Sequence, residues 1–237
     1  ECGRSGETVT TNSEMPSGPL TGHVLIVGAG PGLGMAFARR ALAGGSDVTL
    51  AARSAGTLDE MVSHLGPEGG RVTTLVVDAS QPTALRDTVA TYADACDPSI
   101  NCALFNVSAW VPGGLNSDLD AVSSGLDVGV VAALAMTQAV VPRMLTQSSP
   151  RILFTGGGTA DSPMVASIGL GLQKAALRNL AIALDKDLRE TTIAVRTLTI
   201  RGSIAPGTAF DPDRIARALW QIANSDSVVH EFTGVGD

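Results

Sequence analysis

The chain has 237 residues, a formal net charge of −7 and an apolar content of 44%. This length suits one α/β domain, and a negative charge without a basic cluster argues against nucleic acid as a partner. The three cysteines form no CxxC pair, which argues against a disulfide framework and favours a reducing, cytoplasmic location.

Residues 1–20 are polar and contain no apolar core of a signal peptide. We expect a flexible leader here, with a functional N-terminal arm as the alternative, followed by a single domain over residues 21–237. No later apolar stretch runs without interruption over the length of a membrane span. We therefore expect no membrane partner.

Short apolar runs then alternate with segments of helical periodicity. The apolar runs predict strands over residues 23–27, 48–51, 72–77, 102–105, 151–155, 194–200 and 228–232. The periodic segments predict helices over residues 33–43, 58–65, 83–95, 118–145, 168–190 and 213–223. Strands separated by helices indicate right-handed crossovers. We expect a Rossmann-type, doubly wound parallel sheet of about seven strands with helices on both faces, and a ligand beyond the carboxyl ends of the strands.

The segment 24–34, VLIVGAGPGLG, joins the first predicted strand to the first helix. Leu33 takes the last glycine position of the strict G-x-G-x-x-G pattern, but a G-x-x-x-G-x-G spacing is satisfied. Backbone N–H groups at the start of such a helix bind a pyrophosphate, so a dinucleotide is the expected ligand. A plain strand-to-helix turn is the alternative. The residues assigned to phosphate binding are Gly28, Gly30, Pro31, Gly32, Leu33 and Gly34.

The ends of the next two strands concern the rest of the dinucleotide. An NAD site usually has a carboxylate after the second strand, for the ribose 2′-hydroxyl. Arg53 stands there instead, and its guanidinium suits a 2′-phosphate. We therefore favour NADP(H) over NAD(H), a solvated surface arginine being the alternative. Asp78 and Ala79 close the third strand, where Asp78 either accepts from an adenine amino group or only forms a turn.

Further segments carry a resemblance to a known family. They are VGAGPGLG, Val77-Asp78-Ala79, LFNVSAW after the fourth strand, Thr137-Gln138 with Pro142-Arg143-Met144, and Lys174 followed by Ala-Ala-Leu. With them the chain resembles the short-chain dehydrogenase/reductase family over about residues 22–232. Its ending, TIRGSIAPGTAFDPDRIA, is similar to that of a divergent bacterial subgroup with GPGLG loops. The resemblance implies a nicotinamide dinucleotide cofactor, contacted also by Asn106, Val107, Lys174 and Ile204.

Three of the four catalytic positions of the family are altered in this chain. Counting from Lys174, the catalytic residue that is kept, the family tyrosine falls on Leu170 and the serine on Gly157, and the helix asparagine falls near Gly129. The single tyrosine, Tyr92, lies on the helix after the third strand, where we expect it to be a packing residue. Other polar side chains expected near the strand ends are Ser108, Thr155, Thr159, Asp161 and Ser167, and Trp110 is a candidate wall for a planar substrate.

These observations predict an NAD(P)-dependent oxidoreductase of atypical mechanism. Its substrate is a small apolar carbonyl compound or enone, and the proton comes from solvent or substrate. The alternatives are a catalytically silent nucleotide-binding or regulatory protein and a non-redox biosynthetic enzyme, a cyclase or dehydratase, on the same fold. No metal is expected. The resemblance implies a homodimer or homotetramer formed through the helices near 118–145 and 166–190, and the short connection after Arg201 leaves little room for a lid.

Overall fold

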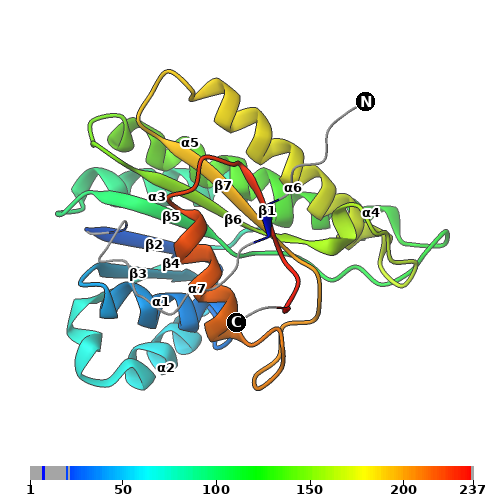
Figure 1. Cartoon of the computed structure of the whole chain (residues 1–237), viewed down its shortest axis with the longest axis horizontal. Helices are drawn as coiled ribbons and strands as arrows, with labels where there is room; N and C mark the ends of the chain where they lie inside the picture. Colours follow the sequence, from blue (N-terminus) through cyan, green and yellow to red (C-terminus); the bar gives the residue numbers. More distant parts are fainter. Residues whose placement is uncertain (1–6, 9–19, 21, 236–237) are drawn as a thin grey trace.

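A parallel sheet is the centre of the computed structural model, which describes residues 7–8, 20 and 22–235 (Figure 1). Within these residues, eight parallel strands lie in the order β1-β8-β7-β6-β5-β2-β3-β4. They are β1 (Glu7–Thr8), β2 (His23–Val27), β3 (Asp47–Ala52), β4 (Val72–Val76), β5 (Ile100–Phe105), β6 (Arg151–Gly157), β7 (Ala194–Ile200) and β8 (Val229–Phe232). Strands β2 to β8 are the seven that the sequence predicts.

The direction in which strands are added reverses at β2. From β2 the chain continues outward through β3 and β4, and it then returns to β5 on the other side of β2. The connections after β2 and β5 therefore diverge, which opens a crevice beyond their carboxyl ends. This confirms the doubly wound topology and fixes where a ligand site belongs.

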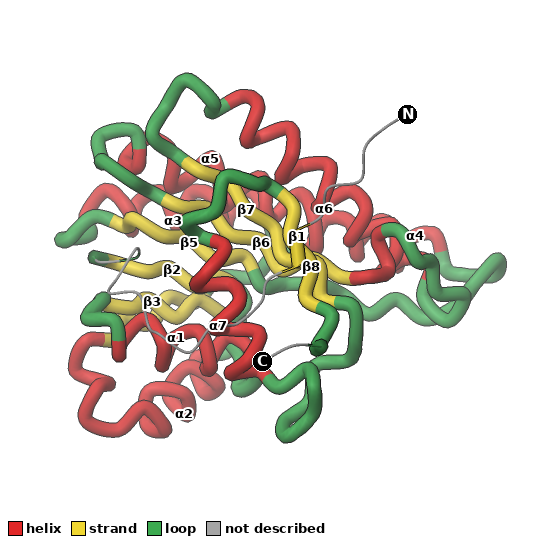
Figure 2. Tube along the Cα trace, in the orientation of Figure 1, coloured by secondary structure: helices red, strands yellow, loops and turns green. Residues whose placement is uncertain are grey.

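Helices cover both faces of the sheet, as the tube in Figure 2 shows. One face carries α1 (Leu33–Ala43), α2 (Ala55–Leu65) and α7 (Pro212–Ile222), and the other carries α3 (Pro82–Ala95), α5 (Ala132–Met144) and α6 (Ile168–Asp187). Neighbouring side chains of a strand point to opposite faces. In β2, accordingly, Val24 and Ile26 join the first core, whereas Leu25 and Val27 join the second.

The long helix predicted over 118–145 contains an irregularity that the sequence pattern does not reveal. It consists of α4 (Leu119–Leu126), a π-helical turn (Asp127–Val131) and α5. Such turns widen a helix locally and are frequent at functional sites. Two buried glycines, Gly125 and Gly129, stand at this point of the helix.

The combined helix Leu119–Met144 also corrects the expectation about apolar stretches. By length and composition alone it is long and apolar enough to cross a membrane. However, half of its most apolar window is buried inside the fold, and α5 packs against α3 and β5. We interpret it as a core helix, because a helix that packs between other elements is apolar on several sides.

Of the leader expected over residues 1–20, the structure describes residues 7, 8 and 20, and these three take part in the fold. Glu7 and Thr8 form β1, which pairs with His230 and Glu231 of β8. Leu20 is fully buried in the first core, and its carbonyl oxygen accepts a hydrogen bond from the Ser46 hydroxyl. The edge of β8 offers unpaired backbone groups, and an apolar Leu20 gains by burial. Residues 1–6 and 9–19 lie outside the described part.

Candidate functional site

The turn between β2 and α1 requires glycine at two positions for internal reasons. Gly28 has a φ of +89°, which L side chains rarely adopt, and a Cβ there would lie 2.5 Å from the Asn106 carbonyl oxygen. Asn106 in turn donates from Nδ2 to the Gly28 carbonyl oxygen at 3.2 Å. A Cβ on Gly34 would lie 3.0 Å from Cα of Ala29, so this glycine lets α1 pack closely on the turn.

Gly30 and Gly32 have no such internal reason to be glycine. A Cβ at either position would meet nothing within 4 Å, and neither residue has a positive φ. Gly32 precedes α1, whose first turn has neither a side-chain cap nor an acidic residue. The first N–H groups of a helix have no carbonyl partner within it and attract anions. The open space and these N–H groups fit a phosphate that approaches the main chain, with Pro31 and Leu33 completing the turn.

A cavity of about 470 Å³ lies beside this turn, at the carboxyl ends of β2 to β5. It brings together five segments that are far apart in the sequence, among them Val128 of the π-helical turn, in the crevice that the topology predicts. Asn106 contributes through its bond to the turn. The other predicted cofactor residues that do not line the cavity are Gly30, Pro31, Gly32, Leu33, Gly34, Lys174 and Ile204. The lining includes five residues that the sequence assigns to the cofactor: Gly28, Arg53, Asp78, Ala79 and Val107.

Two opposite charges stand at the rim of this cavity. Arg53 follows β3 and is exposed, so its guanidinium is accessible to a ligand. Asp78 accepts a hydrogen bond from the Ser80 N–H at 2.9 Å. That bond is the largest cause of a lowered pKa of Asp78, and the nearby charge of Arg53 lowers it further. Asp78 is therefore ionised and takes part in the turn, while its contact with an adenine amino group stays a prediction.

Near the end of β6, the positions assigned to the family's serine and tyrosine carry no hydroxyl. A Cβ on Gly157 would lie 3.3 to 3.6 Å from the side-chain carbons of Lys174, so the glycine leaves room for the lysine. Leu170 stands one turn before Lys174 in α6, on the same side of the helix. Neither residue donates a proton.

Lys174 is buried and turned toward the sheet. Its Nζ donates to the Thr155 carbonyl oxygen at 2.9 Å, and the residue is 8% exposed. Burial lowers the pKa of its ammonium group from 10.5 to about 8. Beside it, the Thr155 hydroxyl is buried without a hydrogen-bond partner among the described residues.

Asp161 is excluded as a protonated acid by its neighbours. Arg201 donates to both of its carboxylate oxygens at 2.9 Å, and Arg178 donates to one of them at 2.9 Å. The two guanidinium groups hold the pKa of Asp161 well below its usual range, the bond from Arg201 being the largest cause. Arg201 also pairs with Glu231 of β8, so its charge is compensated within the fold.

Ser167 and Tyr92 have the structural roles that the sequence suggests. The Ser167 hydroxyl caps α6 by accepting from the Leu170 N–H at 3.3 Å. The Tyr92 hydroxyl lies 2.6 Å from Thr49 Oγ1, which lies 2.6 Å from His23 Nε2. His23 and the nearby Cys96, whose Sγ is 3.1 Å from His23 Nδ1, belong to the amino-terminal edge of the sheet, opposite the cavity.

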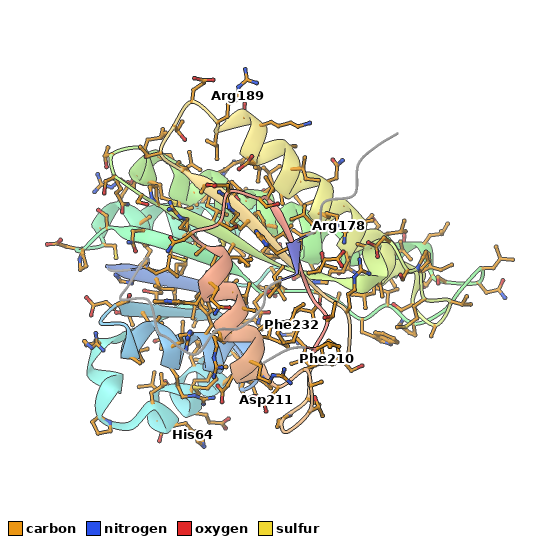
Figure 3. The ribbon with its side chains drawn as sticks, in the orientation of Figure 1. His64, Arg178, Arg189, Phe210, Asp211 and Phe232 are labelled. Atoms are coloured by element: carbon orange, nitrogen blue, oxygen red, sulfur yellow. The ribbon has the colours of Figure 1, made fainter. Side chains whose placement is uncertain are left out.

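The connection after β7 is short and folded against the body of the domain. A Cβ on Gly202 would collide with the Phe210 ring. Figure 3 shows Phe210 beside Phe232, and their ring centroids lie 5.9 Å apart. Ile204 is 42% exposed on this connection. None of residues 201–211 lines the cavity.

Sequence reasoning missed Gln173. Its side-chain amide is buried and bonds to both backbone groups of Ala109 in the cavity wall, each at 2.9 Å. Its partners are main-chain groups 64 positions away, which no local pattern announces. The one sequence signal for this role of Gln173 is the spacing of Gly125 and Gly129. A Cβ at either glycine would contact the Gln173 side chain.

Comparison with known proteins agrees with this arrangement. The sequence matches the family model of the short chain dehydrogenase over residues 22–208. The chain belongs to this family. A relative from Thauera aromatica, named (2S)-[(R)-hydroxy(phenyl)methyl]succinyl-CoA dehydrogenase subunit BbsC, is 31% identical over 220 residues, or 86% of this chain and 87% of the relative. An uncharacterized oxidoreductase of Staphylococcus epidermidis is 24% identical over 79% of this chain and 78% of its own.

Solved structures of the family share the fold. A short chain dehydrogenase from Salmonella enterica superposes with a TM-score of 0.82 at 19% identity, over 93% of this chain and 100% of that one. An NADPH-bound short chain oxidoreductase from Pseudomonas aeruginosa, described as containing an atypical catalytic center, has a TM-score of 0.79 at 18% identity, over 90% of this chain and 95% of that one. At these identities the likeness concerns the fold.

Proposed function

We propose that this member of the family is an NADP(H)-dependent oxidoreductase of atypical mechanism, acting on a carbonyl or enone of a small apolar substrate. The single observation that carries the proposal is the open main-chain turn at Gly30 and Gly32, next to a cavity that Gly28 and Arg53 line. Glycines with open space beside them suit a ligand that approaches the backbone. The names of related oxidoreductases, one of them NADPH-bound, support the same class.

Each part of the cavity suits one part of the dinucleotide. The first N–H groups of α1 bind the pyrophosphate. Arg53 binds the 2′-phosphate, for which a guanidinium provides two parallel donors. Asp78, ionised beside Ser80, is an acceptor for an adenine amino group. When bound, the nicotinamide supplies or accepts a hydride.

The proton has a different source from that of an ordinary member of the family. Leu170 and Gly157 have no acidic proton, and Asp161 is held as a carboxylate by two arginines. A positioned general acid accelerates such reactions by roughly 10²–10⁴-fold. Without one, we propose that solvent or a hydroxyl of the substrate supplies the proton and that turnover is correspondingly slow.

The same observations favour a second candidate, a nucleotide-binding protein without redox turnover. The two candidates differ in a single measurement. A panel of apolar ketones and enones is mixed with the protein and NADPH, and absorbance at the nicotinamide band is followed. Steady consumption above the rate without protein supports the oxidoreductase. Tight NADPH binding without consumption supports the silent protein.

The cofactor assignment is tested with Arg53→Ala. Loss of the charged hydrogen bonds to a 2′-phosphate should weaken NADPH binding by roughly 10- to 100-fold, while NADH binding stays unchanged. Nicotinamide fluorescence or calorimetry gives both dissociation constants. Arg86→Ala is the matched control, because Arg86 lies on α3 and pairs with Asp87 at 2.8 Å. Equal losses for the two nucleotides would remove the NADP preference, and absent binding in the wild type would end the proposal.

A further inference from the structure

Both polar atoms of the Gln173 side chain form hydrogen bonds to Ala109, which belongs to the cavity wall formed by residues 107–110. Gln173 lies in α6 next to Lys174 and is 1% exposed. Its Nε2 donates to the carbonyl oxygens of Ala109, at 2.9 Å, and Gly169, at 3.2 Å, and its Oε1 accepts from the Ala109 N–H at 2.9 Å. Both backbone groups of Ala109 are therefore bound by one side chain.

The segment that Gln173 holds has no secondary structure of its own. Strand β5 ends at Phe105, and residues 106–110 belong to neither a strand nor a helix. Four residues of this segment, Val107, Ser108, Ala109 and Trp110, line the cavity. Asn106 is tied to β2 by its N–H, which donates to the Val27 carbonyl oxygen at 2.8 Å. The next hydrogen bond along the wall is the one to Gln173.

The helix opposite leaves a space that matches Gln173. A Cβ on Gly125 would lie 2.9 Å from its Nε2, and a Cβ on Gly129 would collide with its Oε1. Both glycines belong to the stretch that contains the π-helical turn. Gly129 stands near the position that the family resemblance assigns to an asparagine. A side chain there and the present position of Gln173 exclude each other.

We propose that Gln173 is a positioning residue, which fixes the wall at Ala109 and with it the place of Trp110 beside the ligand. In this interpretation the glycine at position 129 is required by Gln173. The inference deepens the proposed function and rests on it only for the identity of the ligand. The position of the wall is measured without any ligand.

Trp110 reports on the wall directly. The chain has two tryptophans, so Trp220→Phe leaves Trp110 as the only one. In this background, Gln173→Leu keeps the side-chain volume and removes the three bonds. We expect a lower fluorescence anisotropy of Trp110 and at least a twofold change in its quenching by acrylamide, at temperatures well below unfolding, since the wall loses its anchor.

Gln147→Leu is the matched control. Gln147 donates to the carbonyl oxygens of Ile100, at 2.7 Å, and Arg143, at 3.4 Å, and it lies far from the cavity. It should lower the melting temperature without changing the Trp110 signal. If Gln173→Leu, like the control, does not change the anisotropy or the quenching of Trp110, the proposal is overturned.

A double-mutant cycle tests the link to the helix. Gly129→Ala alone should raise the fraction unfolded about tenfold or more at a fixed urea concentration, because the new methyl group displaces Gln173. In the Gln173→Ala background the same change should have less than about a threefold effect, since nothing occupies the space. Equal effects in both backgrounds would contradict the steric coupling.

NADPH binding separates this inference from the proposed function. Gln173→Leu should weaken NADPH binding more than Gln147→Leu does, at equal loss of stability. If the wild type binds no NADPH but Trp110 responds as described, the proposed function fails and the positioning role stands. If NADPH binds equally well to both variants and Trp110 does not respond, the positioning role fails and the proposed function stands.

Discussion

At the scale of single residues, Lys174, which the family resemblance assigns to the catalytic lysine, occupies an unfavourable place. Burial lowers the pKa of its ammonium group from 10.5 to about 8. This corresponds to roughly 3 kcal/mol of destabilisation of the folded protein at neutral pH. A residue kept at such a cost to stability is typical of functional sites.

Lys174→Met should therefore raise the melting temperature at pH 7 by an amount on the order of 5 °C, while NADPH binding weakens. The pH dependence has a definite sign. Between about pH 8 and 10.5 the folded lysine loses its proton first, so the wild type gains stability as pH rises. The advantage of Lys174→Met should shrink over this range. Calorimetric scans at pH 7 and pH 10 measure it, and a variant that is less stable at pH 7 would contradict the assignment.

At the scale of elements, the turn before α1 separates two kinds of glycine. Gly28 has a positive φ and a close neighbour, whereas Gly30 faces open space. Gly28→Ala should lower the melting temperature. Gly30→Ala should leave it unchanged or slightly higher, because alanine restricts the unfolded chain, and yet weaken NADPH binding about tenfold or more. Thermal scans and fluorescence titrations of both variants test this. Unchanged binding in Gly30→Ala would place the phosphates elsewhere.

The elements also show how far sequence patterns reach. Helix α1 was predicted to the residue, because a glycine turn and an apolar face mark it. Helix α2 begins earlier than expected, at Ala55, since the Ser54 hydroxyl caps it by accepting from the Thr57 N–H. The π-helical turn was missed, because the apolar pattern over residues 118–145 continues through it. Sequence patterns thus predict those features of a helix that contacts between nearby residues determine.

At the scale of the whole molecule, the two ends of the parallel strands differ in chemistry. The cavity lies at the carboxyl ends of the strands. The hydrogen-bonded chain of His23, Thr49 and Tyr92 lies toward their amino ends. Arg53 and Asp78 were assigned to the cofactor from their places at the ends of the second and third predicted strands, and both line the cavity. The role of Gln173 depends on which helix packs behind the wall, which sequence alone does not state. The homo-oligomer through the helices near 118–145 and 166–190 stays a prediction.

The buried His23, at the amino-terminal ends of the strands, makes the free energy of unfolding depend on pH in mildly acidic solution. Burial lowers the pKa of His23 below 6.5, and Asp47 and the Pro98 carbonyl group oppose this only in part. The unfolded chain therefore binds the proton more readily, so stability is complete above about pH 6.5 and falls as pH drops toward the folded value. Urea denaturation at pH 7 and pH 5.5 should show this loss, and His23→Gln should show less of it. The lowered pKa of Asp161 acts in more acidic solution, below its usual value of 3.8.

The separation of Cys96 from the cavity has a practical consequence for thiol labelling. Cys102 is fully buried, and burial raises the pKa of its thiol to about 12, so it does not react with maleimides at neutral pH. Cys96 is partly exposed at the amino edge. With Cys2 replaced by serine, we expect a maleimide dye to attach at Cys96 alone, outside the cavity.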